Sequence, residues 1–353
     1  MIYLDYQATT PLAPEALKAM LPWLEQGHAN PHSPHRAGRQ ARAAVEVARD
    51  HVAALLPAGG RVVFTSGATE ALNWAIKGTS GGIVTTAIEH AAILDTAQAT
   101  GRPLTVLPVD GEGLVAPQPV ANGTGLVAAM LVNNEVGTIQ PVAALADVAH
   151  RAGAWMLCDA VQGYGRIAIP ETVDLIALSA HKIYGPKGIG ALWIRDGITL
   201  PPLLYGGDQE GGRSGTLSPA LCAGFGAAAK LMATQAERDA DHVARLWSLA
   251  VERLGAGWTI NGSTERRYRG NLNLRRDGLD VARLMSDCRD IAFSAGSACA
   301  SGSGRPSHVL TALGLTEREA KSSIRLGFGR YTSEAELTEA IDRINTSARA
   351  QGR

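Results

Sequence analysis

Short apolar runs alternate with helix-like stretches between residues 60 and 196. Apolar runs bounded by turn residues are typical of buried strands, and their alternation with helical stretches indicates an α/β fold with a mainly parallel sheet. The pattern predicts six strands, at Val62–Thr65, Ile83–Ala87, Leu126–Val132, Trp155–Cys158, Leu175–Leu178 and Ala191–Ile194.

The pattern changes at about residue 235 of the 353-residue chain. A helix with charged residues follows, then a mixed segment, and then a final helix from about Ser333. The length fits two domains, and the change of pattern indicates a smaller α+β domain after the first. We expect residues 15–235 to form the large domain, and residues 1–14 and 236–353 to form the small one.

Polar or ionisable side chains follow five of the predicted strands. They are Ser66, Thr69 and Glu70 after the first strand, Glu89 and His90 after the second, Asn133, Asn134 and Glu135 after the third, Asp159 and Gln162 after the fourth, and Ser179, His181 and Lys182 after the fifth. In an open α/β sheet, ligands bind beyond the carboxyl ends of the strands. The sequence therefore predicts one shared site at this edge.

Composition and charge exclude several classes of protein. Lys plus Arg and Asp plus Glu both total 33, so no net positive charge attracts nucleic acid or an acidic membrane surface. The N-terminus has no basic segment followed by an apolar one, and no apolar run reaches the roughly 18 residues of a membrane span. We expect a cytoplasmic protein.

The cysteines show no CxxC pair and no closely spaced set; they are Cys158, Cys222, Cys288 and Cys299. This spacing argues against a disulfide framework and against structural zinc. Histidines in the segment 28–35 have metal-like spacing, but Pro31 and Pro34 break the helix that would align them, so we expect no metal. A functional cysteine is then a reactive thiol, and Cys299 lies in the small-residue stretch SAGSACASGSG.

Lys182 follows a predicted buried strand, and Asp159 follows the strand before it. Burial depresses the pKa of a lysine and makes it a nucleophilic amine that can form a Schiff base. A lysine of this kind, with an Asp that keeps a pyridine nitrogen protonated, is the pair that pyridoxal phosphate requires. The alternative is a surface lysine at the end of a strand.

Two further features have a structural and a functional interpretation. The stretch Ser66-Gly67-Ala68-Thr69 lies between a strand and a helix that begins near Ala68, where free N–H groups can bind a phosphate, or where a hydroxyl simply caps the helix. His90 can stack on a flat cofactor ring, or it can be a structural residue at the end of a strand.

Two arginines are candidates for binding anions. Arg213 lies close to the hydroxyl of Thr216, and Arg325 belongs to the stretch SSIRLG. A guanidinium can grip a carboxylate through two parallel hydrogen bonds. The alternative for each is a solvated surface arginine.

With these motifs the chain resembles the cysteine desulfurases of the NifS/IscS type, which belong to the class V aminotransferase group of fold-type I pyridoxal phosphate enzymes. The resemblance covers nearly the whole chain. It rests on stretches such as YLDYQATTPLAPE, TSGATEALNWAIKG, LVNNEVGTIQPV, SAHKIYGPKGIGAL, GSACASGSG and SSIRLGFGRYT.

The resemblance implies a role for each candidate residue and a homodimer with its sites at the interface. It implies that Lys182 forms the Schiff base with pyridoxal 5'-phosphate, that Asp159 pairs with the pyridine nitrogen, that Gln162 donates to the ring hydroxyl and that His90 stacks on the ring. It implies that the phosphate is bound by Ala68, Thr69, Ser179 and His181, together with Thr216 of the neighbouring subunit. It also implies that Asn134 and Arg325 bind the substrate carboxylate and that Cys299 is the nucleophile.

The implied reaction converts L-cysteine to L-alanine. The sulfur moves to Cys299 as a persulfide and then to an acceptor for iron–sulfur cluster or thio-cofactor synthesis. Alternatives are a selenocysteine lyase, a cysteine β-lyase that releases sulfide, or a non-catalytic paralogue that binds a partner. The stretch SGSGRPSHVL lacks the Leu-Glu pair usual in this family, and the chain ends soon after its last predicted helix, so the identity of the acceptor or scaffold stays open.

Overall fold

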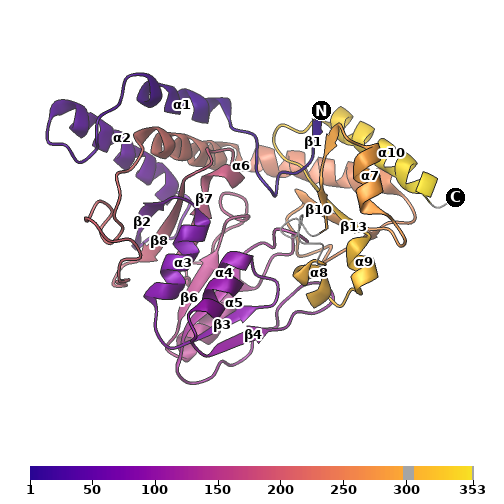
Figure 1. Cartoon of the computed structure of the whole chain (residues 1–353), viewed down its shortest axis with the longest axis horizontal. Coiled ribbons are helices and arrows are strands. Elements are labelled where there is room, and N and C mark those ends of the chain that lie inside the picture. Colours follow the sequence, from indigo (N-terminus) through magenta and orange to yellow (C-terminus); the bar gives the residue numbers. More distant parts are fainter. Residues whose placement is uncertain (297–305, 352–353) are drawn as a thin grey trace.

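The computed structural model describes residues 1–296 and 306–351 (Figure 1). In this part of the chain the largest sheet has seven strands in the order β2-β8-β7-β6-β5-β3-β4. β8 is antiparallel to both of its neighbours, and the other neighbouring pairs are parallel. The bounds are β2 Gly60–Thr65, β3 Gly82–Thr86, β4 Leu104–Leu107, β5 Thr124–Met130, β6 Trp155–Asp159, β7 Leu175–Ser179 and β8 Gly190–Arg195.

Helices cover both faces of this sheet because alternate strand residues point to opposite sides. Val62 and Phe64 belong to one hydrophobic cluster with residues of α2, α5 and α6, whereas Val63 belongs to another with residues of α3 and α4. α1 packs against α6. The bounds are α1 Pro14–Glu25, α2 Arg36–Ala53, α3 Ala68–Gly78, α4 Ala91–Ala99, α5 Val142–Arg151 and α6 Pro219–Leu254, with a short 3₁₀ turn η1 at Ala180–Lys182.

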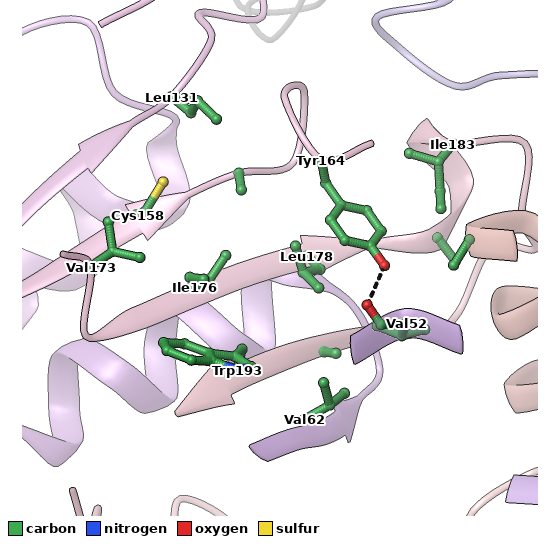
Figure 2. Packing of buried hydrophobic residues seen from close by; sticks show 14 of the residues in the cluster. Val52, Val62, Leu131, Cys158, Tyr164, Val173, Ile176, Leu178, Ile183 and Trp193 are labelled. Carbon is green, nitrogen blue, oxygen red and sulfur yellow. Dashed lines mark hydrogen bonds between the residues drawn. The ribbon is translucent and has the colours of Figure 1, made fainter. Parts of the chain in front are cut away.

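The packing on the first face is drawn in Figure 2. Ile176 and Trp193 lie fully buried on neighbouring strands, and the ring of Tyr164 lies above this layer. The Tyr164 hydroxyl donates to the backbone oxygen of Val52 at 2.7 Å, which satisfies a polar group inside an apolar region. This bond ties α2 to the loop that follows β6.

The C-terminal residues form a second unit around the sheet β12-β13-β10-β9 (Figure 1). Its hydrophobic cluster also contains Ile2 and Leu4 from the start of the chain, since β1 pairs in parallel with β11. The bounds are β1 Ile2–Tyr3, β9 Thr259–Ile260, β10 Asn271–Arg275, α7 Val281–Asp287, β11 Ile291–Ala292, β12 Ser294–Ala295, α8 His308–Ala312, α9 Glu317–Lys321, β13 Ser323–Gly327 and α10 Glu334–Gln351.

The α/β class and the mainly parallel sheet are confirmed, and the six predicted strands are present with ends shifted by at most two residues. β4 is an additional edge strand that the pattern did not predict, because three of its four residues are exposed. The division into residues 15–235 and 1–14 with 236–353 stays a prediction; α6 runs through that boundary without a break. Within the described residues, no helix is both long and apolar enough to cross a membrane.

Candidate active site

A cavity of about 570 Å³ lies beyond the carboxyl ends of β2, β3, β5, β6 and β7. Most of the predicted site residues line it, although they come from six separate segments of the chain. They are Ala68, Thr69, His90, Asn134, Asp159, Gln162, Ser179, His181, Lys182 and Arg325. The structure therefore brings together the side chains that the strand ends predicted.

The N-terminus of α3 faces this cavity. Gly67 is the N-cap residue, and no side chain of the described residues caps the helix. Ser66 and Thr69 therefore do not cap it through their hydroxyls, and the capping interpretation is wrong here. A methyl group on Gly190 would meet the Gly67 backbone at 2.7 Å, so this glycine lets the turn approach β8 closely. The first N–H groups of α3 and the positive end of its dipole are thus available for an anion.

Lys182 ends η1, the turn that follows β7. Its Nζ donates to the backbone oxygens of Gln7 and of Ala8, the latter at 2.8 Å. The side-chain amide of Gln162 donates to the same Gln7 oxygen at 2.9 Å. The N-terminal segment thus closes one side of the cavity. No role in the site was predicted for this segment, because two separate backbone carbonyls leave no signal in a sequence pattern.

Asp159 is the last residue of β6 and is buried at the floor of the cavity. Its Oδ1 accepts the N–H of Val161 at 3.0 Å. Burial raises the pKa of its carboxyl, and the hydrogen bond from Val161 and the positive charge of Lys182 act in the opposite direction. A cation placed against this carboxylate would stabilise its charged form.

His90 and His181 both line the cavity and each has one ring nitrogen engaged. His90 is the N-cap of α4, and its Nδ1 accepts the N–H of Ala92 at 3.1 Å. Its structural role is therefore real and leaves Nε2 as the protonated nitrogen. Nδ1 of His181 lies 3.1 Å from Oγ1 of Thr9. Burial and the charge of Lys182 lower the pKa of His181 to about 4, so its ring is neutral near pH 7.

Arg325 lies in β13 of the C-terminal unit, and its side chain is 1% exposed. Its Nη1 donates to the backbone oxygen of Asn134 at 3.0 Å, and its Nη2 donates to Asp5 at 2.8 Å and to Ser294 at 3.1 Å. It is not a solvated surface arginine. Asp5 was not among the predicted site residues, and its contact with Arg325 spans 320 positions of the chain.

Arg213 and Thr216 lie differently from Arg325. Arg213 forms an ion pair with Glu70 through Nε at 2.8 Å, which anchors its loop to α3 beside the cavity. Thr216 is exposed and is not among the residues that line the cavity.

Cys299 lies outside the described residues. The cysteines inside the described ranges are buried and free of disulfides; they are Cys158, Cys222 and Cys288. Burial raises the pKa of Cys158 well above its usual value and that of Cys222 to about 12. Because the thiolate is the reactive form, these two thiols are poor nucleophiles near neutral pH.

Glu89 and Glu135 are buried carboxyls next to predicted site residues. Glu89 accepts the hydroxyl of Thr86 at 2.6 Å and the N–H of Met130 at 3.1 Å, and burial raises its pKa to about 8. Glu135 accepts the hydroxyl of Ser307, and burial raises its pKa as well. Both side chains support the loops that carry His90 and Asn134.

Residues 2–339 match the Aminotransferase class-V family. The chain belongs to this family. A relative named cysteine desulfurase IscS, from Rickettsia akari, is 40% identical over 97% of this chain and 90% of its own. The mitochondrial cysteine desulfurase of Saccharomyces cerevisiae is 42% identical over 98% of this chain and 74% of its own. The crystal structure of a NifS-like protein from Rickettsia africae, 29% identical, superposes with a TM-score of 0.91 over 98% of this chain and 99% of its own.

Class-V aminotransferases use pyridoxal 5'-phosphate, and the residues present here fit that cofactor. The uncapped N-terminus of α3 offers N–H donors to a phosphate. The buried Asp159 carboxylate needs a cation, which a protonated pyridine nitrogen supplies. Lys182 presents an amine to the same cavity. The chemistry of the three groups matches a phosphorylated pyridine aldehyde.

Proposed function

We propose that this class-V aminotransferase is a cysteine desulfurase that converts L-cysteine to L-alanine and transfers the sulfur to an acceptor. One observation carries the proposal: Lys182, Asp159 and Arg325 line a single cavity. An amine, a buried carboxylate and a guanidinium together suit an amino acid bound to pyridoxal phosphate. The relatives named cysteine desulfurase, about 40% identical over nearly the whole chain, support the choice of substrate.

In this proposal the C-terminal unit and the loop after β5 hold the substrate together. The guanidinium of Arg325 and the side chain of Asn134 bind the α-carboxylate, and both groups lie at the cavity. Lys182 removes the proton from the α-carbon and returns a proton later, because it is an amine at the cavity wall with its N–H groups held by carbonyl oxygens.

The cofactor, when bound, withdraws electrons from the α-carbon and so makes this proton acidic. Asp159 holds the positive charge on the ring nitrogen, Gln162 binds the ring hydroxyl, and His90 packs against the ring. The N-terminus of α3 binds the phosphate. We assign four residues to this site, which are Ala68, Thr69, Ser179 and His181. His181 is neutral and acts as a hydrogen-bond donor.

Cys299 receives the sulfur. Its thiolate forms an S–S bond with the substrate sulfur while the C–S bond of the substrate breaks and leaves its electron pair on carbon, where a proton completes L-alanine. The persulfide is then passed to an acceptor that serves iron–sulfur cluster or thio-cofactor synthesis. The raised pKa values of Cys158 and Cys222 support the assignment to Cys299.

We also propose a homodimer in which Thr216 of each subunit completes the phosphate site of the other. The exposure of Thr216 and its place outside the cavity of its own chain support this arrangement. The ion pair between Arg213 and Glu70 holds the same loop beside α3. A cytoplasmic location is part of the proposal.

The test is product analysis on the purified protein with L-cysteine. We expect equal amounts of L-alanine and of sulfur bound to protein, with a persulfide on a peptide that contains Cys299. The Cys299→Ser variant should bind L-cysteine and form no persulfide. If this variant consumed L-cysteine at the wild-type rate, transfer through Cys299 would be wrong.

The same experiment separates the alternatives. Release of free sulfide with pyruvate and ammonia would indicate a cysteine β-lyase, and a strong preference for L-selenocysteine would indicate a selenocysteine lyase. A protein that stays colourless after addition of pyridoxal phosphate would be a non-catalytic paralogue, because the bound cofactor absorbs visible light.

A further inference from the structure

Three side chains from distant parts of the chain meet at the outer edge of the Arg325 guanidinium. Nη2 of Arg325 lies 2.8 Å from Oδ1 of Asp5 and 3.1 Å from Oγ of Ser294, and the Ser294 hydroxyl donates to the same Asp5 oxygen at 2.8 Å. The three atoms therefore form a closed triangle of hydrogen-bond distances.

The backbone fixes this triangle. Ser294 in β12 lies directly opposite Arg325 in the antiparallel register of β12 with β13. Asp5 forms a bridge with Gly327, two residues further along β13. β10 pairs along one edge of β13, so Asp5 and Ser294 are both held by paired backbone along the other edge of this strand, which carries Arg325.

The triangle leaves part of the guanidinium available to a ligand. The Asp5 and Ser294 oxygens, which are in hydrogen-bond contact with each other, both accept from Nη2. Nη1 gives one N–H to the backbone oxygen of Asn134. Arginine has five N–H groups, three acceptors lie around this guanidinium, and Nε has no partner among the described residues. At least two N–H groups therefore remain for a ligand such as a carboxylate.

The charges point in the same direction. The Arg325 side chain is 1% exposed, and Asp5 is the carboxylate paired with it. A buried guanidinium with no counter-charge is strongly destabilising, and a long side chain without partners samples other rotamers. Asp5 therefore neutralises Arg325 when no substrate is bound and keeps its fork in one orientation.

We propose that Asp5, with the help of Ser294, is a positioning residue that aims Arg325 at the α-carboxylate of the substrate. The inference rests on the proposed function, since it takes an amino acid as the ligand of Arg325. It assigns a role to two residues outside the set that touches substrate or cofactor. The opposite relation, in which Asp5 competes with the substrate carboxylate for Arg325, makes the opposite prediction for removal of the Asp5 charge.

The test compares two ligands of the holoenzyme that differ only in the carboxylate. L-Alanine and ethylamine share an amine and a methyl group, and ethylamine has no carboxylate. Each is titrated into wild type, Asp5→Asn and Ser294→Ala, and binding is followed by the change in visible absorbance of the cofactor. Asp342→Asn is the matched control, because Asp342 pairs with Arg253 at 2.6 Å on the exposed surface.

For Asp5→Asn we expect the Kd for L-alanine to rise by about ten- to a hundred-fold, the effect of losing a hydrogen bond to a charged group. For Ser294→Ala we expect the Kd for L-alanine to rise by about three-fold to ten-fold, because the bond from Arg325 to Ser294 is longer and Arg325 keeps its ion pair with Asp5. The Kd for ethylamine should stay within about two-fold of wild type in both variants, and Asp342→Asn should match wild type with both ligands.

Each other outcome has a distinct meaning. A tighter Kd for L-alanine in Asp5→Asn would show competition and overturn the proposal, as would equal losses for both ligands, which indicate general damage. If Asp5→Asn does not fold, the ratio of the two Kd values in Ser294→Ala decides alone. If wild type itself does not prefer L-alanine to ethylamine, the assignment of Arg325 in the proposed function fails, and not merely that of Asp5.

Discussion

The wall of the cavity built by the large sheet and the wall built by the C-terminal sheet satisfy their polar groups differently. On the first wall, the N-terminus of α3 has no side-chain cap among the described residues, and burial raises the pKa of Asp159. On the second wall, the guanidinium of Arg325 already has a carboxylate, a hydroxyl and a carbonyl around it.

This difference matches how long each ligand stays. A cofactor that remains bound through every turnover supplies the partners that the first wall lacks. The substrate that we propose for Arg325 leaves after each turnover, so the second wall carries its own counter-charge and keeps its polar groups paired between turnovers. Substitutions on the first wall should therefore affect retention of the cofactor, and those on the second should affect only the affinity for amino acids.

The largest effect should come from Asp159→Asn on the first wall. A neutral amide cannot balance a protonated ring nitrogen, and breaking a buried ion pair costs about 3–5 kcal/mol, or roughly 10²–10⁴-fold. We expect a loss of this size in the rate of L-alanine formation, together with weaker retention of pyridoxal phosphate in dialysis. Normal cofactor content and normal rate would contradict the contrast between the walls.

The second effect concerns Glu89, which lies behind the first wall. Its pKa is raised by burial from 4.5 to about 8, so the folded protein keeps a proton that the unfolded chain loses between these values. The stabilisation is complete below about pH 4.5 and is lost as pH rises toward 8, by about 1.4 kcal/mol per pH unit.

Glu89→Gln should remove this dependence, because the amide reproduces the protonated acid without titrating. Urea unfolding of both proteins at pH 5 and pH 8 measures the free energies. The free energy of unfolding of the variant should rise relative to that of wild type between pH 5 and pH 8. An equal difference between the two proteins at both pH values would show that Glu89 does not titrate in this range.

On the second wall, Arg325→Lys should raise the KM for L-cysteine by about a hundred-fold, because lysine lacks the fork that matches a carboxylate. The content of pyridoxal phosphate should stay at the wild-type level. A variant that loses the cofactor instead would show that the two walls do not act separately.

The smallest effect should come from Thr216→Val, which we expect to weaken retention of the cofactor by about ten-fold through one lost bond to the phosphate. When Thr216→Val subunits are mixed with Lys182→Ala subunits, retention of the cofactor should return to the wild-type level. In a mixed dimer, the site that keeps Lys182 receives an intact Thr216 from the other subunit. Absence of recovery in dimers shown to be mixed would mean that Thr216 acts within its own chain or has no role.

The first wall could be predicted from the sequence to a large extent. Asp159 directly follows one short apolar run and Lys182 lies four residues after the end of another, at Leu178, and parallel strands bring such residues to one edge whatever the details of packing. Likewise, the start of α3 at Ala68 follows from the Ser-Gly-Ala-Thr turn, although the pattern did not distinguish a capped helix from an uncapped one.

The second wall was less accessible, and the reason is sequence distance. Arg325 was proposed from its type and from the family resemblance, while Asp5 and Ser294 were not proposed at all. They reach Arg325 through β1 and β12, which are two residues long and carry no periodicity. Pairing between such short strands depends on packing of the whole unit, which a local pattern does not contain.

The unbroken helix α6 has a consequence for the substrate. Its buried residues belong to the large cluster as far as Met232 and to the C-terminal cluster from Val243 onward, so one rod of about 54 Å is embedded in both units. In the proposed function, Lys182 and Arg325 belong to two units that share this helix, so the distance between the site for the amine and the site for the carboxylate is fixed. A ligand whose amine and carboxylate share one carbon should fit this distance, and a comparison of the Kd values of L-alanine and β-alanine would measure how strictly the distance is kept.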